Sequence, residues 1–420
     1  LRGYGGASFA SCDNLGLERQ MTDKAFEVDG IADRLLDEAS ISRNAYESWE
    51  LNVAELDTFA HHQLCKVILL TYYGTYGACS EQWGLYCNGF IEGVALSYKK
   101  TGSPVDTRPA LYHNWVHAVD VTHTTARILA MVGTQHYLSM SERFALTVAA
   151  VCHDLGHWGF NNSFLVETHH ELAIRYNDHS PLENMHAALL FELARQPHMA
   201  IFSEFNPPKH KEVRQVAIEA ILHTDYMHHS SMVKELQTLY DMNQELFDDS
   251  TSLWRDGIVS FPSREVAEFA LGSDVKKHLR VLFLHLADIS NPMKPWSMAE
   301  PWAKLLVEEM LRQGDVERDR GLPVQPLHDR ETLNKAYSQM NFIEFFVAPL
   351  LFASARLMPT LSDAVEHMVD NAEHWHSRWV EDSEPPEEEQ QRVADRVARL
   401  REKQHMRPAC SRNRKAGDDS

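Results

Sequence analysis

The chain has 420 residues, of which 44% are hydrophobic and 24% are charged. This balance is typical of an ordinary globular protein and excludes a wholly disordered chain. Forty basic residues stand against sixty acidic ones, which gives a net charge of −20. Nucleic-acid-binding proteins carry basic surfaces, so that class is disfavoured. An anionic substrate would need local positive charge, such as a metal ion, because the field of the whole molecule repels it.

The six cysteines form no CxxC pair and have no dense spacing, so we expect free thiols in a reducing compartment. No run of eighteen apolar residues occurs, and residues 1–11 do not resemble a signal peptide. We therefore expect a cytoplasmic protein without a membrane span. A homodimer and an upstream regulatory domain are both compatible with the sequence, which decides neither.

Most of the chain shows the periodicity of amphipathic helices. Residues 1–53 are an irregular N-terminal extension with one short helix near 31–39. Strand-like alternation is scarce between residues 54 and 383, so this part predicts one compact all-α domain of about 14–16 helices. The predicted helices are 57–72, 81–99, 114–133, 141–155, 181–196, 209–226, 230–247, 263–289, 298–312, 329–357 and 359–380.

Residues 384–420 differ in composition from the predicted domain. An acidic, proline-containing linker comes first, then a polar helix over about 387–404, and residues 407–420 are expected to be disordered. Val393, Val397 and Leu400 lie on one stripe of this helix. It could be a short partner-binding helix or a solvated helix after a linker. We favour the solvated helix, because it offers few apolar positions.

Three distant segments place metal-ligand residue types in apolar helices. His113 and His117 are four residues apart, so they share a helix face. His153 and Asp154 end the apolar run before them, and Asp288 interrupts another apolar helix shortly before a proline. Each aspartate alone could cap a helix or pair locally. Burial of the carboxylates is costly without a cation, so the three segments together favour a metal site.

Two imidazoles and two carboxylates form a mixed nitrogen and oxygen site that suits zinc. One aspartate can also bridge to a harder ion held mostly by water, such as magnesium or manganese. Two such ions lower the pKa of a bridging water from about 15.7 toward roughly 7 and neutralise phosphate oxygens. The chemistry indicated is hydrolysis of a phosphoester.

The segments that carry this chemistry also resemble a known family. Tyr112–Asp120, His153–His157 and Ala287–Pro292 are similar to the catalytic signature of the class I 3′,5′-cyclic nucleotide phosphodiesterases, a branch of the HD metallohydrolases. The resemblance covers about residues 60 to 380, also includes Thr224-Asp225 and Ser338–Phe342, and is strongest to the cyclic-AMP-specific members. It implies an HD-type catalytic domain that hydrolyses the 3′ phosphoester bond to give the 5′-monophosphate and so ends second-messenger signalling.

The resemblance also implies a role for each position of the metal site. The ligands of the tighter metal, Zn²⁺, would be His117, His153, Asp154 and Asp288. Asp154 would also bind the second metal, Mg²⁺ or Mn²⁺, and metal-bound water would be held by His157, Glu183 and Thr224. His113 would be the general acid that protonates the departing O3′ while hydroxide bridging the metals attacks phosphorus. Glu309 would orient the His113 imidazole.

The base of the nucleotide is expected at Gln339 and Phe342, which share a helix face. One would hydrogen-bond a purine edge and the other would stack on it; without the resemblance we would interpret Phe342 as a core residue. Asn291 occupies a position where the cyclic-AMP-preferring members carry asparagine, whereas a glutamine amide can rotate to serve either purine. We therefore expect cyclic AMP as the preferred substrate, with cyclic GMP left open. The remaining pocket residues implied are Tyr112, Ile289, Leu306 and Val307.

Two other functions compete with this interpretation. Another HD-type hydrolase, acting on a nucleoside triphosphate or a guanosine polyphosphate, would have no purine clamp at Gln339 and Phe342. A catalytically inactive sensor that binds a nucleotide would be expected to have lost a metal ligand or the acid, and all of these residues are present.

Overall fold

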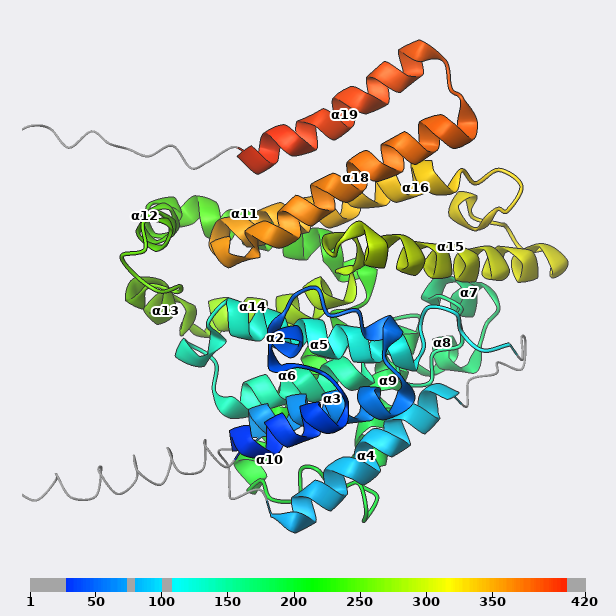
Figure 1. Ribbon diagram of the computed structural model, residues 1–420. Helices are drawn as coiled ribbons and strands as arrows, with labels where there is room; N and C mark the ends of the chain where they lie inside the picture. Colours follow the sequence, from blue (N-terminus) through cyan, green and yellow to red (C-terminus); the bar gives the residue numbers. More distant parts are fainter. Residues whose placement is uncertain (1–27, 74–79, 100–107, 406–420) are drawn as a thin grey trace, which may run out of the picture.

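The computed structural model describes residues 28–73, 80–99 and 108–405. Within these ranges the chain is helical and forms no strand, which confirms the all-α prediction (Figure 1). Cys65 and Cys152 are buried free thiols. The expected disordered tail and most of the N-terminal extension lie outside the described residues, although residues 28–38 are helical.

The helices follow one another with short connections. The α-helices are α2 (Arg43–Glu47), α3 (Thr58–Tyr73), α4 (Glu81–Lys99), α5 (Trp115–Met131), α6 (Met140–Cys152), α7 (Asn162–Glu167), α8 (Glu171–Arg175), α9 (Pro181–Ala194), α10 (Pro207–Leu222), α11 (His229–Met242), α12 (Gln244–Arg255), α13 (Arg264–Ala270), α14 (Ser273–Asp288), α15 (Trp296–Asp319), α16 (Lys335–Phe342), α17 (Ala348–Leu357), α18 (Ser362–Ser383) and α19 (Glu387–His405). Short 3₁₀ turns are η1 (Val53–Glu55), η2 (Thr134–His136), η3 (Tyr226–His228), η4 (Asn291–Met293), η5 (Pro326–His328) and η7 (Pro359–Leu361). One π turn, η6 (Ile343–Val347), joins α16 to α17.

The centre of the fold is built around α6, which packs against α3, α5 and α10. Nearly every residue of α6 is buried, from Ser141 to Cys152. A capping box in which Ser139 and Glu142 bond to each other's backbone N–H groups fixes its start. Helix α14 packs against α5 and α10. The ends of α6 and α14 are therefore held firmly inside the molecule.

Three of the predicted long helices are interrupted. Residues 230–247 divide into α11 and α12 at Asn243, whose φ of −132° is not helical. Residues 263–289 divide into α13 and α14 at Leu271 and Gly272. Residues 329–357 become helical only at Lys335 and then pass through the π turn. Apolar periodicity continues across these breaks, so it did not mark them.

The C-terminal helix α19 is not the solvated helix that we favoured. It runs along the outer side of α18, at the top of the molecule (Figure 1). The apolar stripe Val393, Val397 and Leu400 is buried, and Arg401 pairs with Asp370 of α18. Three apolar positions are enough here because salt bridges flank them.

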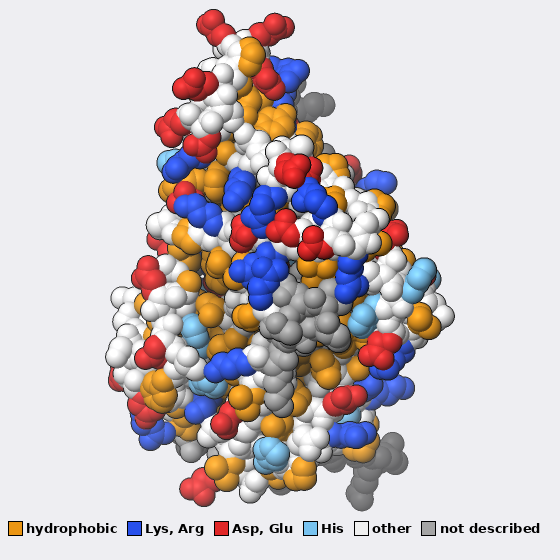
Figure 2. All heavy atoms as spheres, turned by 90° about the vertical axis from the view of Figure 1, so that its right-hand side faces the viewer, with side chains coloured by type: hydrophobic (Ala, Val, Ile, Leu, Met, Phe, Trp, Pro, Cys, Tyr) orange, Lys and Arg blue, Asp and Glu red, His pale blue; other side chains and the backbone are white. Residues whose placement is uncertain are grey.

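Residues 335–357 form a helical stretch long and apolar enough to cross a membrane by length and composition. Half of its most apolar part is buried against the rest of the fold, as in a core helix, so it is weak evidence for a span. Figure 2 shows basic and acidic side chains interspersed on the face turned to the viewer. The described side chains in this view do not form the broad basic surface that nucleic acids require. Among the ion pairs at the surface, Arg330 pairs with Glu308 and Asp315.

Candidate active site

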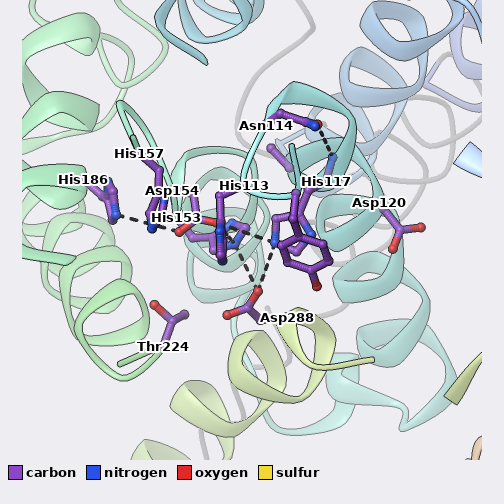
Figure 3. Close-up of polar contacts among 12 residues, drawn as sticks. His113, Asn114, His117, Asp120, His153, Asp154, His157, His186, Thr224 and Asp288 are labelled. Atoms are coloured by element: carbon purple, nitrogen blue, oxygen red, sulfur yellow. Dashed lines mark hydrogen bonds and ion pairs between the residues drawn. The ribbon is translucent and has the colours of Figure 1, made fainter. Parts of the chain in front are cut away.

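The site forms where one helix begins and two helices end. Asn114 caps α5 by accepting hydrogen bonds from the backbone N–H groups of Val116 and His117, so His117 lies in the first turn of this helix. Helix α6 ends at Cys152, directly before His153 and Asp154. Helix α14 ends at Asp288, four residues before Pro292. Figure 3 shows these side chains pointing toward one another.

The four predicted metal ligands come together at hydrogen-bonding distances. The Oδ1 atom of Asp288 lies 3.2 Å from Nε2 of His117 and 3.3 Å from Nε2 of His153. The Oδ2 atom of Asp154 lies 3.5 Å and 3.1 Å from the same two nitrogens. Both imidazoles are fully buried and the carboxylates nearly so. Two nitrogens and two carboxylate oxygens thus face a common point.

The hydrogen bonding of His153 indicates what belongs at that point. Its Nδ1–H donates to the carbonyl oxygen of Ala150 at 2.7 Å, so in the neutral imidazole the lone pair of Nε2 faces the carboxylates. A lone pair facing carboxylate oxygens is repulsive unless a cation lies between them. Nε2 of His153 and Oδ2 of Asp154 are buried 3.1 Å apart, yet among the described residues neither forms a hydrogen bond of acceptable geometry. This donor set fits a divalent cation, with zinc well suited.

The electrostatics of the site also favour a cation. The C-terminal ends of α6 and α14 both point at it, and each carries about half a negative charge from its unpaired carbonyls. Burial raises the pKa of Asp154, but the adjacent His153 more than offsets this and holds the pKa well below its usual range. Burial also raises the pKa of Asp288, but His153 and His117 together outweigh burial and hold this pKa below its usual value. Both carboxylates are therefore ionised at neutral pH.

His113 lies beside this cluster and is held by Glu309 from α15. Its Nδ1 forms a short hydrogen bond with Oε1 of Glu309, whose Oε2 accepts a bond from the backbone N–H of Tyr112 at 2.8 Å. Burial lowers the pKa of the His113 imidazole, but the Glu309 carboxylate outweighs burial and raises the pKa to about 9. Nε2 of His113 is then an N–H donor, free to face a substrate.

The remaining predicted metal-site residues also line the same cavity. The His157 ring stacks on His113 with centroids 4.1 Å apart, and burial lowers the pKa of His157 to about 3. Glu183 accepts a hydrogen bond from Asn162 at 2.9 Å, and burial together with Asp225 raises its pKa to about 8. Thr224 faces the cavity too. These three residues could hold water near the cation and do not contact the four-ligand cluster directly through any described hydrogen bond.

The cavity has a volume of about 310 Å³ and extends from the metal cluster to α16. This is large enough for a small-molecule ligand. Gln339 and Phe342 both line it, and the Phe342 ring stacks on Phe346 with centroids 5.4 Å apart. The amide of Gln339 has no hydrogen-bond partner among the described residues. It is therefore available to a ligand.

Asn291 is held in one orientation from behind. Its Nδ2 lies 3.3 Å from Oδ2 of the buried Asp120, and its Oδ1 accepts a hydrogen bond from the Tyr112 hydroxyl. A carboxylate only accepts, so Asp120 requires the NH₂ group of Asn291 on its side. These two hydrogen bonds thus fix which side of the Asn291 amide carries the oxygen and which carries the NH₂ group.

One predicted pocket residue is misplaced. Ile289, Leu306, Tyr112 and Asn291 line the cavity, as expected, but Val307 does not. Val307 is buried one position further round α15, and the cavity is lined instead by Ala303, Leu306 and Met310. These three follow the three- and four-residue spacing of a helix face.

The sequence interpretation missed several lining residues. Phe346 follows Phe342 by four residues and so lies on the same side of the helical run, which was a usable signal. His186, which follows Glu183 by three, is buried next to the cluster and not part of the cavity lining, and its Nε2 lies 3.7 Å from Oδ1 of Asp154. Trp302 and His285 also line the cavity. No local pattern marked these two, because they face the cavity only through the packing of α14 and α15.

Comparison with known proteins gives the family. Residues 112–368, more than half of the chain, match the model of the 3′5′-cyclic nucleotide phosphodiesterase family. The chain belongs to this family. The matched region contains His117, His153, Asp154 and Asp288 of the cluster as well as Gln339 and Phe342 at the other end of the cavity.

Two curated relatives and one solved structure illustrate the similarity. The dual specificity calcium/calmodulin-dependent 3′,5′-cyclic nucleotide phosphodiesterase 1B of Mus musculus is 36% identical over 265 residues, which cover 63% of this chain and 43% of that protein. The high affinity cGMP-specific 3′,5′-cyclic phosphodiesterase 9A of Mus musculus is 32% identical over 268 residues, covering 63% of this chain and 45% of that protein. Both matches span less than half of the relative's length.

The phosphodiesterase domain of the Salpingoeca rosetta rhodopsin phosphodiesterase is similar in structure, with a TM-score of 0.65 and 26% sequence identity. The alignment covers 83% of this chain and 94% of that domain. It agrees with the all-α architecture and extends the similarity beyond the residues that the family model matches.

Proposed function

We propose that the protein hydrolyses the 3′ phosphoester bond of a 3′,5′-cyclic nucleotide to give the 5′-monophosphate. The observation that carries this proposal is the convergence of two imidazoles and two carboxylates in the wall of a cavity whose other end is formed by Gln339 and Phe342. A phosphodiester and a purine base attached to it need such a metal end and such a base end at the same time.

The metal end would be held by His117, His153, Asp154 and Asp288, with Zn²⁺ at the first site and Mg²⁺ or Mn²⁺ at the second, which Asp154 would share. Such ions supply an activated water as the nucleophile and offset the charge of the phosphate. His157, Glu183 and Thr224 would orient water around the second ion. The carboxylates that this arrangement needs are already ionised, because their pKa values are depressed.

The proton for the leaving group would come from His113. An alkoxide at O3′ is a poor leaving group, so a donor at this oxygen lowers the barrier. Glu309 fixes the ring by accepting from Nδ1 and keeps the imidazole protonated at neutral pH. His113 is thus supported as the acid by its position beside the cluster as well as by its pKa.

For the base, we propose cyclic AMP as the preferred substrate, with cyclic GMP also accepted. The adenine amino group is a donor where guanine carries the acceptor O6. Since Asp120 and Tyr112 fix the amide of Asn291, its carbonyl cannot exchange with its NH₂ group to suit both bases. The untethered amide of Gln339 can rotate for either purine, which supports activity on both. The names of the two mouse relatives describe dual and cyclic-GMP specificity and lend no support to the cyclic-AMP preference.

The rest of the proposal concerns the whole protein. We place the catalytic domain at residues 54–383, preceded by the extension 1–53 and followed by 384–420. A cytoplasmic location, an upstream regulatory domain and a homodimer are consistent with a chain that spans under half of its relatives.

The test is hydrolysis of cyclic AMP and cyclic GMP by the purified chain, with and without added Mg²⁺, by wild type and Asp288→Ala. We expect metal-dependent turnover of both nucleotides, with a higher kcat/KM for cyclic AMP, and loss of turnover in the variant. Unchanged turnover in Asp288→Ala would overturn the metal assignment. A higher kcat/KM for cyclic GMP would overturn the base preference alone.

Gln339→Ala separates this function from that of another HD-type hydrolase. If the cavity binds a purine at Gln339, the variant loses affinity for the cyclic nucleotide and its KM rises. Full cyclic-nucleotide activity in Gln339→Ala, together with turnover of a nucleoside triphosphate or guanosine polyphosphate, would favour the competing hydrolase.

A further inference from the structure

One arginine of α19 holds the outer face of the helical run that forms the base end of the cavity. Nη2 of Arg396 lies 2.6 Å from Oδ1 of Asn341 and 2.6 Å from Oε2 of Glu344, and Nη1 lies 3.0 Å from the hydroxyl of Tyr337. Its guanidinium also lies over the ring of Phe345, 5.2 Å from the centroid. The side chain is only 16% exposed. All three nitrogens of the guanidinium thus have a partner, and the contact is largely desolvated.

The residues that Arg396 holds alternate with those that line the cavity. Tyr337, Asn341, Glu344 and Phe345 face outward toward α19. Gln339, Phe342 and Phe346 face inward and line the cavity. Arg396 therefore bonds to the outer face of the helical run whose inner face would contact the base.

The held segment contains the π turn. In Ile343–Val347 the hydrogen-bonded ring is wider than in an α-helix, and such turns are rare and occur mostly at functional sites. Glu344 and Phe345 lie within it, and Phe342 directly precedes it. A side chain that bonds to residues before this turn and to Glu344 within it limits how the helix can shift there.

Helix α19 is itself anchored independently of Arg396. Val393, Val397 and Leu400 are buried, and Arg401 pairs with Asp370 and Glu373 of α18. Arg396 thus extends from a fixed helix. The residues that match the family model end at position 368, so α19 lies outside the matched region.

We propose that Arg396 is a positioning residue that sets nucleotide affinity by fixing α16 and the π turn, so that α19 controls the base end of the site from outside it. This rests on the proposed function for the identity of the ligand. Because the metal cluster lies at the opposite end of the cavity, on α5, α6 and α14, loss of the contact weakens nucleotide binding and leaves the chemical step intact.

The test compares Arg396→Gln with Arg401→Gln in the full chain. Both changes remove an arginine of α19, but the second breaks contacts to α18 and to Gln404 of α19 itself, and none of its partners lies in α16 or the π turn. We expect Arg396→Gln to raise KM for the cyclic nucleotide about tenfold with kcat within about twofold of wild type. We expect Arg401→Gln to leave both within about twofold, and Arg396→Lys to recover part of the loss, because it keeps the charge without the fork.

Amide hydrogen exchange supplies a readout that does not need turnover. Arg396→Gln should speed exchange in residues 339–347, with exchange in α5, α6 and α14 unchanged, and Arg401→Gln should not. Asn341→Ala removes one partner of Arg396 and leaves α19 in place, so it serves as a second variant if Arg396→Gln folds poorly. We expect it to show the same rise in KM and in exchange of residues 339–347, with a smaller magnitude.

Two outcomes would overturn the positioning role. One is an Arg396→Gln variant with wild-type KM and wild-type exchange in 339–347. The other is a fall in kcat equal to that in Asp288→Ala, which would place the effect at the metal end. If the wild type itself turns over no cyclic nucleotide, the proposed function fails, whereas the exchange experiment still decides whether Arg396 fixes α16.

Discussion

Asp288 shows at the scale of one residue why the site needs a cation. Its carboxylate is buried between two imidazole nitrogens, 3.2 and 3.3 Å away, at the negative end of α14. Burying a carboxylate costs several kcal/mol unless a positive charge offsets it.

Replacing Asp288 with asparagine should abolish metal-dependent activity. The amide keeps the size of the carboxylate and removes its charge. Loss of a residue that only hydrogen-bonds to a metal ligand typically lowers metal affinity or activity by about 10–100-fold, so for a ligand itself we expect kcat/KM to fall by more than about 100-fold. Asp274→Asn, the same change at an exposed position in the first turn of α14, is the matched control and should leave kcat/KM unaltered. Bound metal measured by elemental analysis should fall in the first variant only. Equal metal content in both would contradict the assignment.

The His113–Glu309 pair predicts the alkaline limb of the pH profile. The pKa of His113 is raised to about 9, so the protonated acid persists at neutral pH and is lost as pH rises through that value. Bound cations will shift this limb to lower pH. Glu309→Gln removes the carboxylate that raises the pKa, so the limb of kcat/KM should move down by about 1–2 pH units.

Glu308 provides the control for this experiment. It is adjacent to Glu309 but pairs with Arg330 at the surface, so Glu308→Gln should keep the wild-type profile. Superimposable profiles for wild type and Glu309→Gln would refute the role of Glu309. A substrate with a nitrophenolate leaving group needs no acid, so it should show no alkaline limb in either enzyme.

Asp120 makes a prediction about base selection. Asp120→Asn removes the obligatory acceptor behind Asn291, and the Asn291 amide can then rotate. We expect the ratio of kcat/KM for cyclic AMP to that for cyclic GMP to move toward 1 by about three- to tenfold, the value of one buried hydrogen bond. The measurement is the paired assay on both nucleotides. A ratio that stays at the wild-type value would show that Asn291 does not select the base.

At the scale of elements, local signals predicted which side chains come together in the four-residue cluster. The end of the apolar run at Cys152 and Pro292 after Asp288 are visible in the sequence, and they mark where two of the three helices of the cluster end. The base end was less predictable. Val307 and Met310 both fit an apolar helix face, and only the packing of α15 decides which one lines the cavity.

The docking of α19 could not be predicted for the same reason. Val393, Val397 and Leu400 are too few to distinguish a packed helix from a solvated one until the surface of α18 is known. The salt bridges of Arg396 and Arg401 join residues more than 25 positions apart. Such contacts leave no local pattern in the sequence.

The packing of α15 onto η5 predicts a large effect of one methyl group. A Cβ at Gly314 would lie 1.9 Å from the carbonyl oxygen of His328, a backbone atom that cannot move aside cheaply. Gly314→Ala should therefore lower the free energy of unfolding by about 1–3 kcal/mol. Gly84→Ala in α4 meets no atom within 4 Å and should be neutral or stabilising by up to about 1 kcal/mol. The measurement is the Tm of each variant relative to wild type. Equal Tm shifts in Gly314→Ala and Gly84→Ala would contradict the packing argument.

At the scale of the whole molecule, folding gathers negative charge at one internal point. The molecule carries a net charge of −20, and the site brings together two of its carboxylates and the C-terminal ends of two helices. In the metal-free protein, protonation of an imidazole can compensate this charge. Burial lowers the pKa of His153, but Asp154 and Asp288 outweigh burial and hold it well above its usual value. A proton and a metal ion therefore compete for the same nitrogen.

This competition sets the sign of a stability measurement. The raised pKa of His153 stabilises the metal-free fold fully below about pH 6.5, and that contribution is lost as pH rises through the folded-state pKa. The depressed pKa values of the two aspartates stabilise the fold above about pH 4, and this contribution is lost only as pH falls through the folded-state values, so they do not change between pH 6 and pH 8.

Zinc binding must displace the His153 proton, so its stabilisation of the fold should grow with pH. We expect the Tm difference between zinc-loaded and chelator-treated protein to be larger at pH 8 than at pH 6, because tighter binding adds RT ln(1 + [L]/Kd), about 1.4 kcal/mol per tenfold in affinity. Asp288→Asn should reduce this difference at both values, while Asp274→Asn should reproduce the wild type. A difference that is equal at the two pH values, or larger at pH 6, would mean that the metal does not replace the proton on His153.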